Sequence, residues 1–303
     1  MATTIDLLMK NKNSDGSFTV LHPITKTANV KTSEAIEVML PSAVGSFKPG
    51  DVIQPETSIN DIVKKLLQVQ ILPTYSDPSE SIKSSLTTYS HEVGTTISPK
   101  ITATFTKNDA GALTNHQIFK DGTEVASGTD TTVEYSDSFT QGTATVKYTA
   151  TATYGDGEIK NDNFGNPYGD TSIKAGSKTS SEISYSGYRK YFYGADDGAA
   201  AITTSADIRG LSDKSTKAAA AGTTFTVKAL AGDTRVTFAY DASLRDVSSV
   251  KYVEAGNDES KSLFTKTTVS VEGANGFEGT DYKVYTMIGD QPFLADMTFA
   301  VTI

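Results

Sequence analysis

The chain has 303 residues and a formal net charge of −9, and 21% of its residues are charged. A chain of this length is expected to form about two domains, and its acidic balance argues against nucleic acid as a partner, because phosphate binding needs clustered lysine and arginine. The sequence contains no cysteine, which excludes disulfides and thiolate metal sites.

Residues 1–57 are predicted to form a compact attachment segment rather than a full domain. Phe18–Leu21 and Ala35–Leu40 are short extended runs of the kind that form strands. Pro23 lacks a backbone donor, so the first run can continue only as an edge strand. Pro49 and Gly50 indicate a turn.

A short helix is predicted next, within a segment 58–85 that ends in the polar, Ser/Pro-rich linker Thr74–Ser85. Ser58 is placed to cap the helix, and Asp61 three residues later completes an acidic variant of the capping box. Apolar side chains then follow helical spacing, at Ile59, Ile62, Val63, Leu66 and Leu67. A helix of about a dozen residues is marginal alone in water, so this stripe must pack on the attachment segment or on other copies of the chain. We interpret it as a candidate oligomerisation surface.

Residues 86–187 are predicted to form an immunoglobulin-like β-sandwich. Apolar and polar residues alternate from Lys100 to Thr106 and from Ala144 to Tyr154, which indicates strands with one buried face. Asp121–Gly122 between two extended runs is a two-residue hairpin signal. The cysteine–tryptophan pin of antibody domains is absent, so the prediction concerns the architecture alone.

Residues 188–303 are predicted to form a second β-sandwich. A Tyr-rich run from Tyr188 to Tyr193 opens it, and Ser205–Leu211 has the pattern of one helical turn. The last seven residues repeat the two-residue period, with apolar side chains at Met297, Phe299, Val301 and Ile303. The predicted fold class is therefore mainly β: an N-terminal anchor with one short helix, followed by two immunoglobulin-like β-sandwich domains.

No catalytic residue, cofactor or metal site is predicted, and the chain is not expected to be an enzyme. The histidines at His22, His91 and His116 lie far apart and are expected on the surface or in loops. The carboxylate-rich stretch from Asp156 to Asp170 is expected to be a turn-rich hairpin connection, because it lacks the calcium-loop order. The Tyr-rich run is expected to be a packed strand, and its candidate surface contacts are Tyr188, Arg189, Tyr191 and Tyr193.

Three segments resemble bacteriophage virion proteins. The string Phe-Thr-Val-Leu-His-Pro-Ile-Thr-Lys-Thr-Ala-Asn-Val at 18–30 resembles the attachment heads of phage fibre and baseplate-appendage proteins. Pro49–Ile53, leading into the helix, is similar to sequences in virion proteins of phages from gut bacteria, and Gly187–Gly194 resembles C-terminal modules of such proteins. The resemblance implies that the attachment residues are Phe18, Leu21, His22, Pro23 and Val30.

The function that the resemblance implies is a structural component of a phage particle. The chain would form an oligomeric fibre or spike, a trimer, anchored by its N-terminus and projecting its β domains for adhesion to a host surface. It lacks long glycine-rich repeats and a coiled-coil shaft, which favours a short spike, a head fibre or a baseplate-proximal piece. Expected partners are capsid or tail proteins, other copies of the chain, and host polysaccharide or protein.

The expected place of work is the virion, assembled in the cytoplasm of the host bacterium. The N-terminus lacks the apolar region of a signal peptide, and no apolar run is long enough for membrane insertion. The alternative interpretation is a glycan-active enzyme or a carbohydrate-binding module of a phage spike. Against the enzyme, the acidic residues lie mainly in turns and the sequence contains no tryptophan platform.

Overall fold

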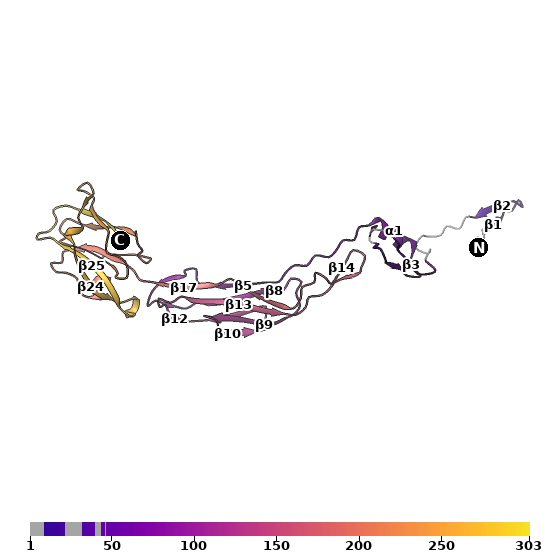
Figure 1. The fold of residues 1–303 in the computed structure, drawn as a ribbon, viewed down its shortest axis with the longest axis horizontal. Coiled ribbons are helices and arrows are strands. Elements are labelled where there is room, and N and C mark those ends of the chain that lie inside the picture. The colour runs from indigo at the N-terminus through magenta and orange to yellow at the C-terminus, as the bar shows by residue number, and fades with distance from the viewer. Residues whose placement is uncertain (1–8, 22–31, 40–43, 46) are drawn as a thin grey trace. The chain divides into compact units, whose positions relative to one another are not determined.

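The computed structural model describes residues 9–21, 32–39, 44–45 and 47–303 (Figure 1). The chain divides into two units. The N-terminal unit contains the residues up to Ser76 together with 157–173, and the sandwich unit contains Asp77–Asp156 and Lys174–Ile303. Strands dominate the described residues and the helices are short, so the predicted fold class, mainly β with immunoglobulin-like sandwiches, is confirmed.

The N-terminal unit consists of small hairpins and one helix. Its elements are β1 (Met9–Lys12), β2 (Phe18–Leu21), β3 (Ile36–Glu37), β4 (Val52–Ile53), α1 (Ile59–Leu67), β14 (Lys160–Asn161) and β15 (Pro167–Tyr168). The pairs β1–β2, β3–β4 and β14–β15 are each antiparallel. Phe18 and Leu21 lie in β2, as predicted, whereas His22, Pro23 and Val30 lie outside the described residues.

Helix α1 begins at the predicted cap. The Ser58 hydroxyl accepts a hydrogen bond from the Asp61 backbone N–H at 3.1 Å and donates one to Asp61 Oδ2 at 2.7 Å. This reciprocal pair satisfies one of the backbone donors that a helix leaves unpaired at its start. The helix ends at Leu67 because Gln68 is already extended, so it is shorter than the dozen residues predicted.

The first sandwich packs two sheets that are antiparallel except for one parallel pair. One sheet has the spatial order β10 (Thr123–Gly128), β9 (Leu113–Lys120), β13 (Val146–Tyr154), β17 (Ile183–Tyr188), β6 (Ser90–Glu92). Strand β16 (Gly176–Thr179) also pairs with β13, and the parallel pair is β17 with β6. The other has β11 (Thr132–Ser136), β8 (Lys100–Thr106) and β5 (Ser79–Ser84), and β7 (Thr96–Ile97) pairs with β12 (Phe139–Thr140). The core contains Ile101, Ala103, Ile118, Tyr148 and Ala150, which the two-residue period places on the inner faces.

The first sandwich begins earlier than predicted, at Ser79 rather than at residue 86. Strand β5 pairs with β8 along its whole length, and Ile82 packs against the core. The sequence shows no apolar alternation here, because two of the three inward positions, Glu80 and Ser84, are polar. The outer face of the strand carries serine and lysine. The linker prediction for 74–85 is therefore corrected: the second half of that stretch is a sandwich strand.

The second sandwich also packs two sheets. One has the order β19 (Asp213–Lys214), β18 (Phe192–Asp196), β21 (Arg235–Asp241), β25 (Thr280–Ile288), β24 (Thr265–Val271), and the other β20 (Thr224–Ala229), β26 (Met297–Thr302), β22 (Ser249–Tyr252), β23 (Asp258–Glu259). Helix α2 (Ser205–Arg209) forms where one helical turn was predicted, and short 3-10 helices lie at Lys261–Leu263 and Ala274–Gly276.

The predicted C-terminal strand is confirmed as β26. It lies between β20 and β22, so it is bonded on both sides. Phe299, Val301 and Ile303 have no exposed surface and lie in the core with Phe238 of β21. The predicted Asp121–Gly122 hairpin is also present, with both residues at positive φ (50° and 80°), the conformation that such a two-residue turn needs.

Candidate functional site

The apolar stripe of α1 faces outward. Ile59, Val63 and Leu66 keep 41%, 42% and 41% of their surface exposed, and Leu67 keeps 80%. These positions follow the i, i+4, i+7, i+8 spacing of a single helix face, and Ile62 alone of the predicted set is half-buried on another side. Of the two packing partners that the sequence left open, residues 1–57 of the same chain do not cover this face in their described part.

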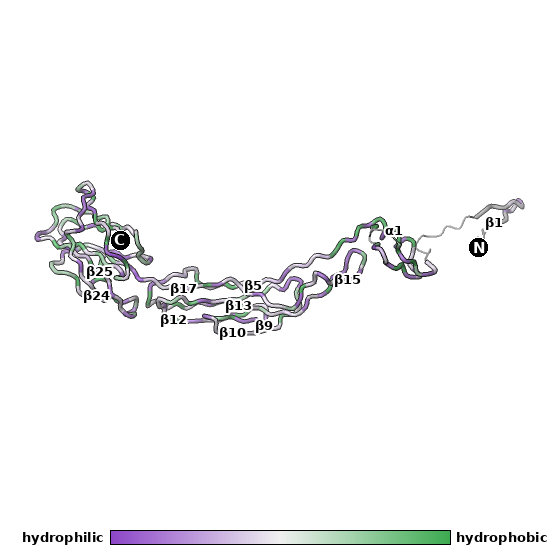
Figure 2. The backbone as a smooth tube through the Cα atoms, in the orientation of Figure 1, coloured by the Kyte–Doolittle hydropathy of each residue, from purple (hydrophilic) through white to green (hydrophobic). Residues whose placement is uncertain are grey.

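The N-terminal unit as a whole buries little apolar surface. Among its described residues, the buried apolar side chains are Val38 and Phe47. Its large apolar side chains that stay exposed are Ile36, Met39, Val44, Val52, Ile59, Val63, Leu66, Leu67, Val69, Ile71, Leu72 and Ile159. Figure 2 shows hydrophobic stretches at α1 and in the segment after it. An exposed apolar patch marks an interaction site in a soluble protein, and the stripe on one face of α1 is a patch of this kind.

The segment after α1 is fastened to the β14–β15 hairpin. The hydrogen bonds run from Gln70 Nε2 to Asp162 Oδ2 (2.7 Å), from Ile71 N to Asn163 Oδ1 (2.8 Å) and from the Tyr75 hydroxyl to the Tyr168 carbonyl (2.7 Å). Burial alone would raise the pKa of the Asp162 carboxyl, but hydrogen bonds from Gln70, Asn166 and Phe164 lower it to about 2. The carboxylate-rich connection is therefore a hairpin, as predicted, and it braces residues 69–75.

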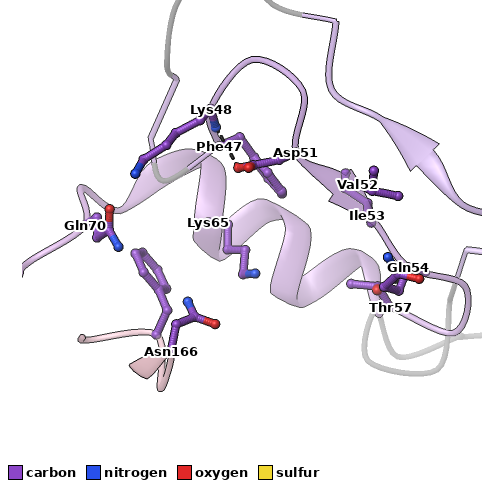
Figure 3. Close-up of a pocket in the computed structure, with 11 residues that line it drawn as sticks. Phe47, Lys48, Asp51, Val52, Ile53, Gln54, Thr57, Lys65, Gln70 and Asn166 are labelled. Atoms are coloured by element: carbon purple, nitrogen blue, oxygen red, sulfur yellow. Dashed lines mark hydrogen bonds between the residues drawn. The ribbon is translucent and has the colours of Figure 1, made fainter. Parts of the chain in front are cut away.

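The polar side of α1 faces a cavity of about 380 Å³ (Figure 3). It lies between the helix, the segment 47–57 and the β14–β15 hairpin, and Phe47, Lys48, Lys65 and Asn166 are among the residues that line it. The Lys65 ammonium lies 5.8 Å from the centre of the Phe47 ring, a cation–π contact that orients the lysine along the wall.

The two sandwiches are joined through a buried carboxylate. Glu92 is 8% exposed, and its carboxylate forms salt bridges with Lys190 Nζ at 2.7 Å and with Arg209 Nη1 at 2.8 Å. The Ala274 backbone N–H also donates to the Val93 carbonyl at 2.7 Å. Gly94 has φ +89°, and a Cβ there would collide with the Ala274 carbonyl oxygen, so this close approach requires glycine.

We predict that Glu92→Gln lowers the free energy of unfolding by about 1.5–3 kcal/mol near neutral pH, the range for a hydrogen bond to a charged group. Burial would raise the pKa of Glu92, but the hydrogen bonds and charges of Lys190 and Arg209 outweigh it and lower the pKa. A carboxyl whose pKa is lower in the folded state than in the unfolded state stabilises the fold at pH values above its unfolded-state pKa. This stabilisation is lost as the pH falls through the folded-state pKa. Thermal unfolding of both proteins from neutral to acid pH should therefore show the difference shrinking below about pH 4.5.

The matched control for Glu92→Gln is Glu134→Gln. Glu134 pairs with Lys100 at 2.8 Å, but both side chains are about half exposed. Such a pair contributes about 0–1 kcal/mol. Equal losses in the two variants, or a Glu92→Gln loss that grows toward acid pH, would contradict the assigned role of Glu92.

His116 corrects the prediction that the histidines lie on the surface or in loops. It is fully buried in β9, where Nδ1 bonds the Asp130 carbonyl (2.9 Å) and Nε2 bonds Glu80 Oε1 (3.0 Å). Burial raises the pKa of Glu80, against the lowering effect of His116, and Glu80 Oε2 has no hydrogen-bond partner among the described residues. The pair fastens β5 of one sheet to β9 of the other. No local pattern around His116 signals this contact, because Glu80 is distant in sequence.

The candidate surface residues of the Tyr-rich run lie in different environments in the structure. Tyr191 is 7% exposed and belongs to the core of the second sandwich, which corrects its assignment as a surface residue. Tyr193 packs against that core, with its ring centre 4.9 Å from that of Phe225. Tyr188 and Arg189 remain partly exposed and line a cavity of about 440 Å³ at the junction of the sandwiches.

The described residues contain no group of three or more histidine, aspartate or glutamate side chains placed to hold a metal ion. Within the same ranges, no helix has the length and hydropathy needed to cross a membrane.

Comparison with known proteins identifies no family. No protein-family model matches the chain, and no curated protein matches it. Among solved structures, the chain is similar to the crystal structure of the CARDB domain of a Pyrococcus furiosus protein in complex with di-metal ions, at 11% identity and a TM-score of 0.21. That match covers 37% of this chain and 96% of the domain.

Proposed function

We propose that this chain is a structural component of a bacteriophage particle. It forms an oligomeric appendage, a trimer, that attaches through residues 1–57 and projects two β-sandwiches toward a host surface. The proposal begins from the resemblance of residues 18–30 and 187–194 to phage virion proteins. Its main structural support is the N-terminal unit, whose described part exposes an apolar helix face and buries few apolar side chains.

The spacing of the exposed residues of α1 supports assembly through this helix. Ile59, Val63 and Leu66 are separated by four and then three positions, the seam of a coiled coil. A nine-residue helix is too short to be stable alone, but copies related by rotation would bury one another's stripe. Small units without disulfides commonly rely on oligomerisation for stability.

We expect Leu66→Lys combined with Leu67→Lys to convert the trimer into a monomer, because two charges would enter the apolar seam. Light scattering on the purified full chain measures the mass, and circular dichroism should show unchanged strand content. Leu294→Lys is the matched control, since Leu294 is 99% exposed in the second sandwich and lies outside the seam. A wild-type chain that is monomeric at micromolar concentration would refute assembly through α1.

The particle role is tested by locating the chain in purified phage. Antibodies against the sandwiches should label intact particles at one structure, and electron microscopy shows whether that structure is the head, the tail or the baseplate. Particles assembled from a genome lacking residues 1–57 of this gene should not be labelled. Absence of the chain from wild-type particles would overturn the proposal.

The second candidate function is a carbohydrate-binding module, and the cavity at the sandwich junction favours it. Besides Tyr188 and Arg189, this cavity is lined by Asp241 and the hydroxyl residues Ser243 and Thr280. Carboxylates, hydroxyls and an aromatic ring are groups that can bind sugar hydroxyls. Saturation-transfer NMR with galactose, glucose and N-acetylglucosamine tests it: a signal that Asp241→Asn abolishes supports this candidate, and no signal excludes these sugars as ligands.

A further inference from the structure

The face of α1 that points away from the apolar stripe lies in a continuous groove. The cavity of about 380 Å³ in Figure 3 adjoins a second cavity of about 360 Å³, and the two share Lys65 and Phe164 as lining residues. On a helical wheel, Lys65 is roughly 140° away from the centre of the apolar stripe. An occupant of the groove would therefore leave the stripe free for other copies of the chain.

The groove carries positive charge in a chain whose net charge is −9. Its cationic side chains are Lys48, Lys64 and Lys65. Its lining also contains two carboxylates, so three lysines against Asp51 and Asp61 leave a formal excess of one positive charge. Asp51 Oδ2 accepts a hydrogen bond from the Lys48 backbone N–H at 2.7 Å, and Asp61 Oδ2 accepts one from the Ser58 hydroxyl. A site lined in this way attracts an anionic partner.

The other groove residues fit a peptide backbone. Gln54 and Gln68 lie along the two cavities, and neither side-chain amide has a hydrogen bond within the described residues. Each amide offers donors and an acceptor, which are the groups that pair with the N–H and C=O of an extended chain. The Phe47 and Phe164 rings add apolar wall between these polar groups.

We propose that this surface, the lysine groove formed by Lys48, Lys64, Lys65, Gln54 and Gln68, binds an extended acidic peptide segment of the particle protein to which the chain attaches. The proposal rests on the proposed attachment function and names the chemistry of its partner. Carboxylate side chains pair with the lysines, and the peptide backbone pairs with the glutamine amides. A polyphosphate or nucleic acid would use the lysines but not the glutamine amides, so these polyanions serve as the competing outcome of the test.

The test measures binding to the full-length chain by fluorescence polarisation. The probe is a fluorescein-labelled octapeptide of alternating glutamate and serine, and the reference is the same peptide with lysine in place of glutamate. We expect the acidic peptide to bind and the basic one not to bind, with affinity that falls as salt rises. Lys48→Met combined with Lys65→Met should weaken binding at least about tenfold, which corresponds to about 1.4 kcal/mol.

Lys107→Met is the matched control, because Lys107 is exposed in the turn after β8 and lies outside the groove. It should leave binding unchanged, and light scattering should show the same oligomeric state for all variants. Three results would overturn the proposal: no preference for the acidic peptide, an equal loss in the control, or tighter binding of inorganic polyphosphate that displaces the peptide.

A second arm separates the groove from the particle role. A photo-crosslinking amino acid at Gln54 in assembled phage should capture a particle peptide of net negative charge, identified by mass spectrometry. If the acidic peptide binds in solution but this chain is absent from purified particles, the attachment function is rejected and peptide binding by the lysine groove is retained. If the crosslinker captures a neutral or basic peptide in particles, acidic-peptide binding by the lysine groove is rejected and the attachment function is retained.

Discussion

Deletion of residues 297–303 is expected to unfold the second sandwich. Strand β26 is the only element that joins β20 to β22 among the described residues, so its loss divides that sheet. Phe299, Val301 and Ile303 are fully buried, and each contributes about 1.5–3 kcal/mol by leaving water. Together these three contributions approach the free energy of unfolding of an ordinary domain. Limited proteolysis should cleave the shortened protein within 188–296 while fragments of the first sandwich persist.

The control for this deletion compares the two faces of β26. Val301→Ser places a hydroxyl in the core, whereas Ala300→Ser changes the neighbouring, half-exposed position on the other face. Only Val301→Ser should lower the melting temperature substantially, because it removes apolar burial and introduces a polar group among apolar ones. If the chain without 297–303 melts like the full chain, the strand is not part of the core.

A chain that starts at Asp77 is expected to fold, and one that starts at Leu86 is not. The shorter chain lacks β5, which supplies the whole edge of the β11–β8–β5 sheet. It also lacks Glu80, which leaves the buried His116 ring without its carboxylate partner. An unpaired buried polar group costs about 1–3 kcal/mol, in addition to the lost packing of Ile82.

Circular dichroism and size-exclusion chromatography distinguish the two truncated chains. The chain from Asp77 should be soluble, rich in strand and cooperative on heating, and the chain from Leu86 should aggregate. Within the full chain, Glu80→Ala should reproduce part of the loss, whereas Lys83→Ala, on the outer face of the same strand, should have little effect. Equal stability of both truncated chains would show that β5 is dispensable.

The elements that sequence reasoning predicted correctly are those whose signal is local. The stripe in β26, the inner positions of β8 and β13, and the Asp121–Gly122 turn each follow from side-chain alternation or from backbone preference over a few residues. Ser58 as the cap of α1 belongs to the same class, because its partner Asp61 is three residues away. Such features need no knowledge of distant contacts.

The features that only the tertiary structure decided depend on partners far apart in the sequence. Strand β5 was predicted as linker because its inward Glu80 is polar, and only the distant His116 explains why that carboxyl is buried. Glu92 joins the sandwiches through Lys190 and Arg209, and Tyr191 enters a core built from later strands. The α1 stripe could be read from sequence, but its exposure could not, because exposure depends on which segments fold over the helix. Local pattern determined β8, β13, β26, the Asp121–Gly122 turn and the start of α1. Long-range packing determined where β5 lies, which faces are covered and which polar groups are buried in pairs.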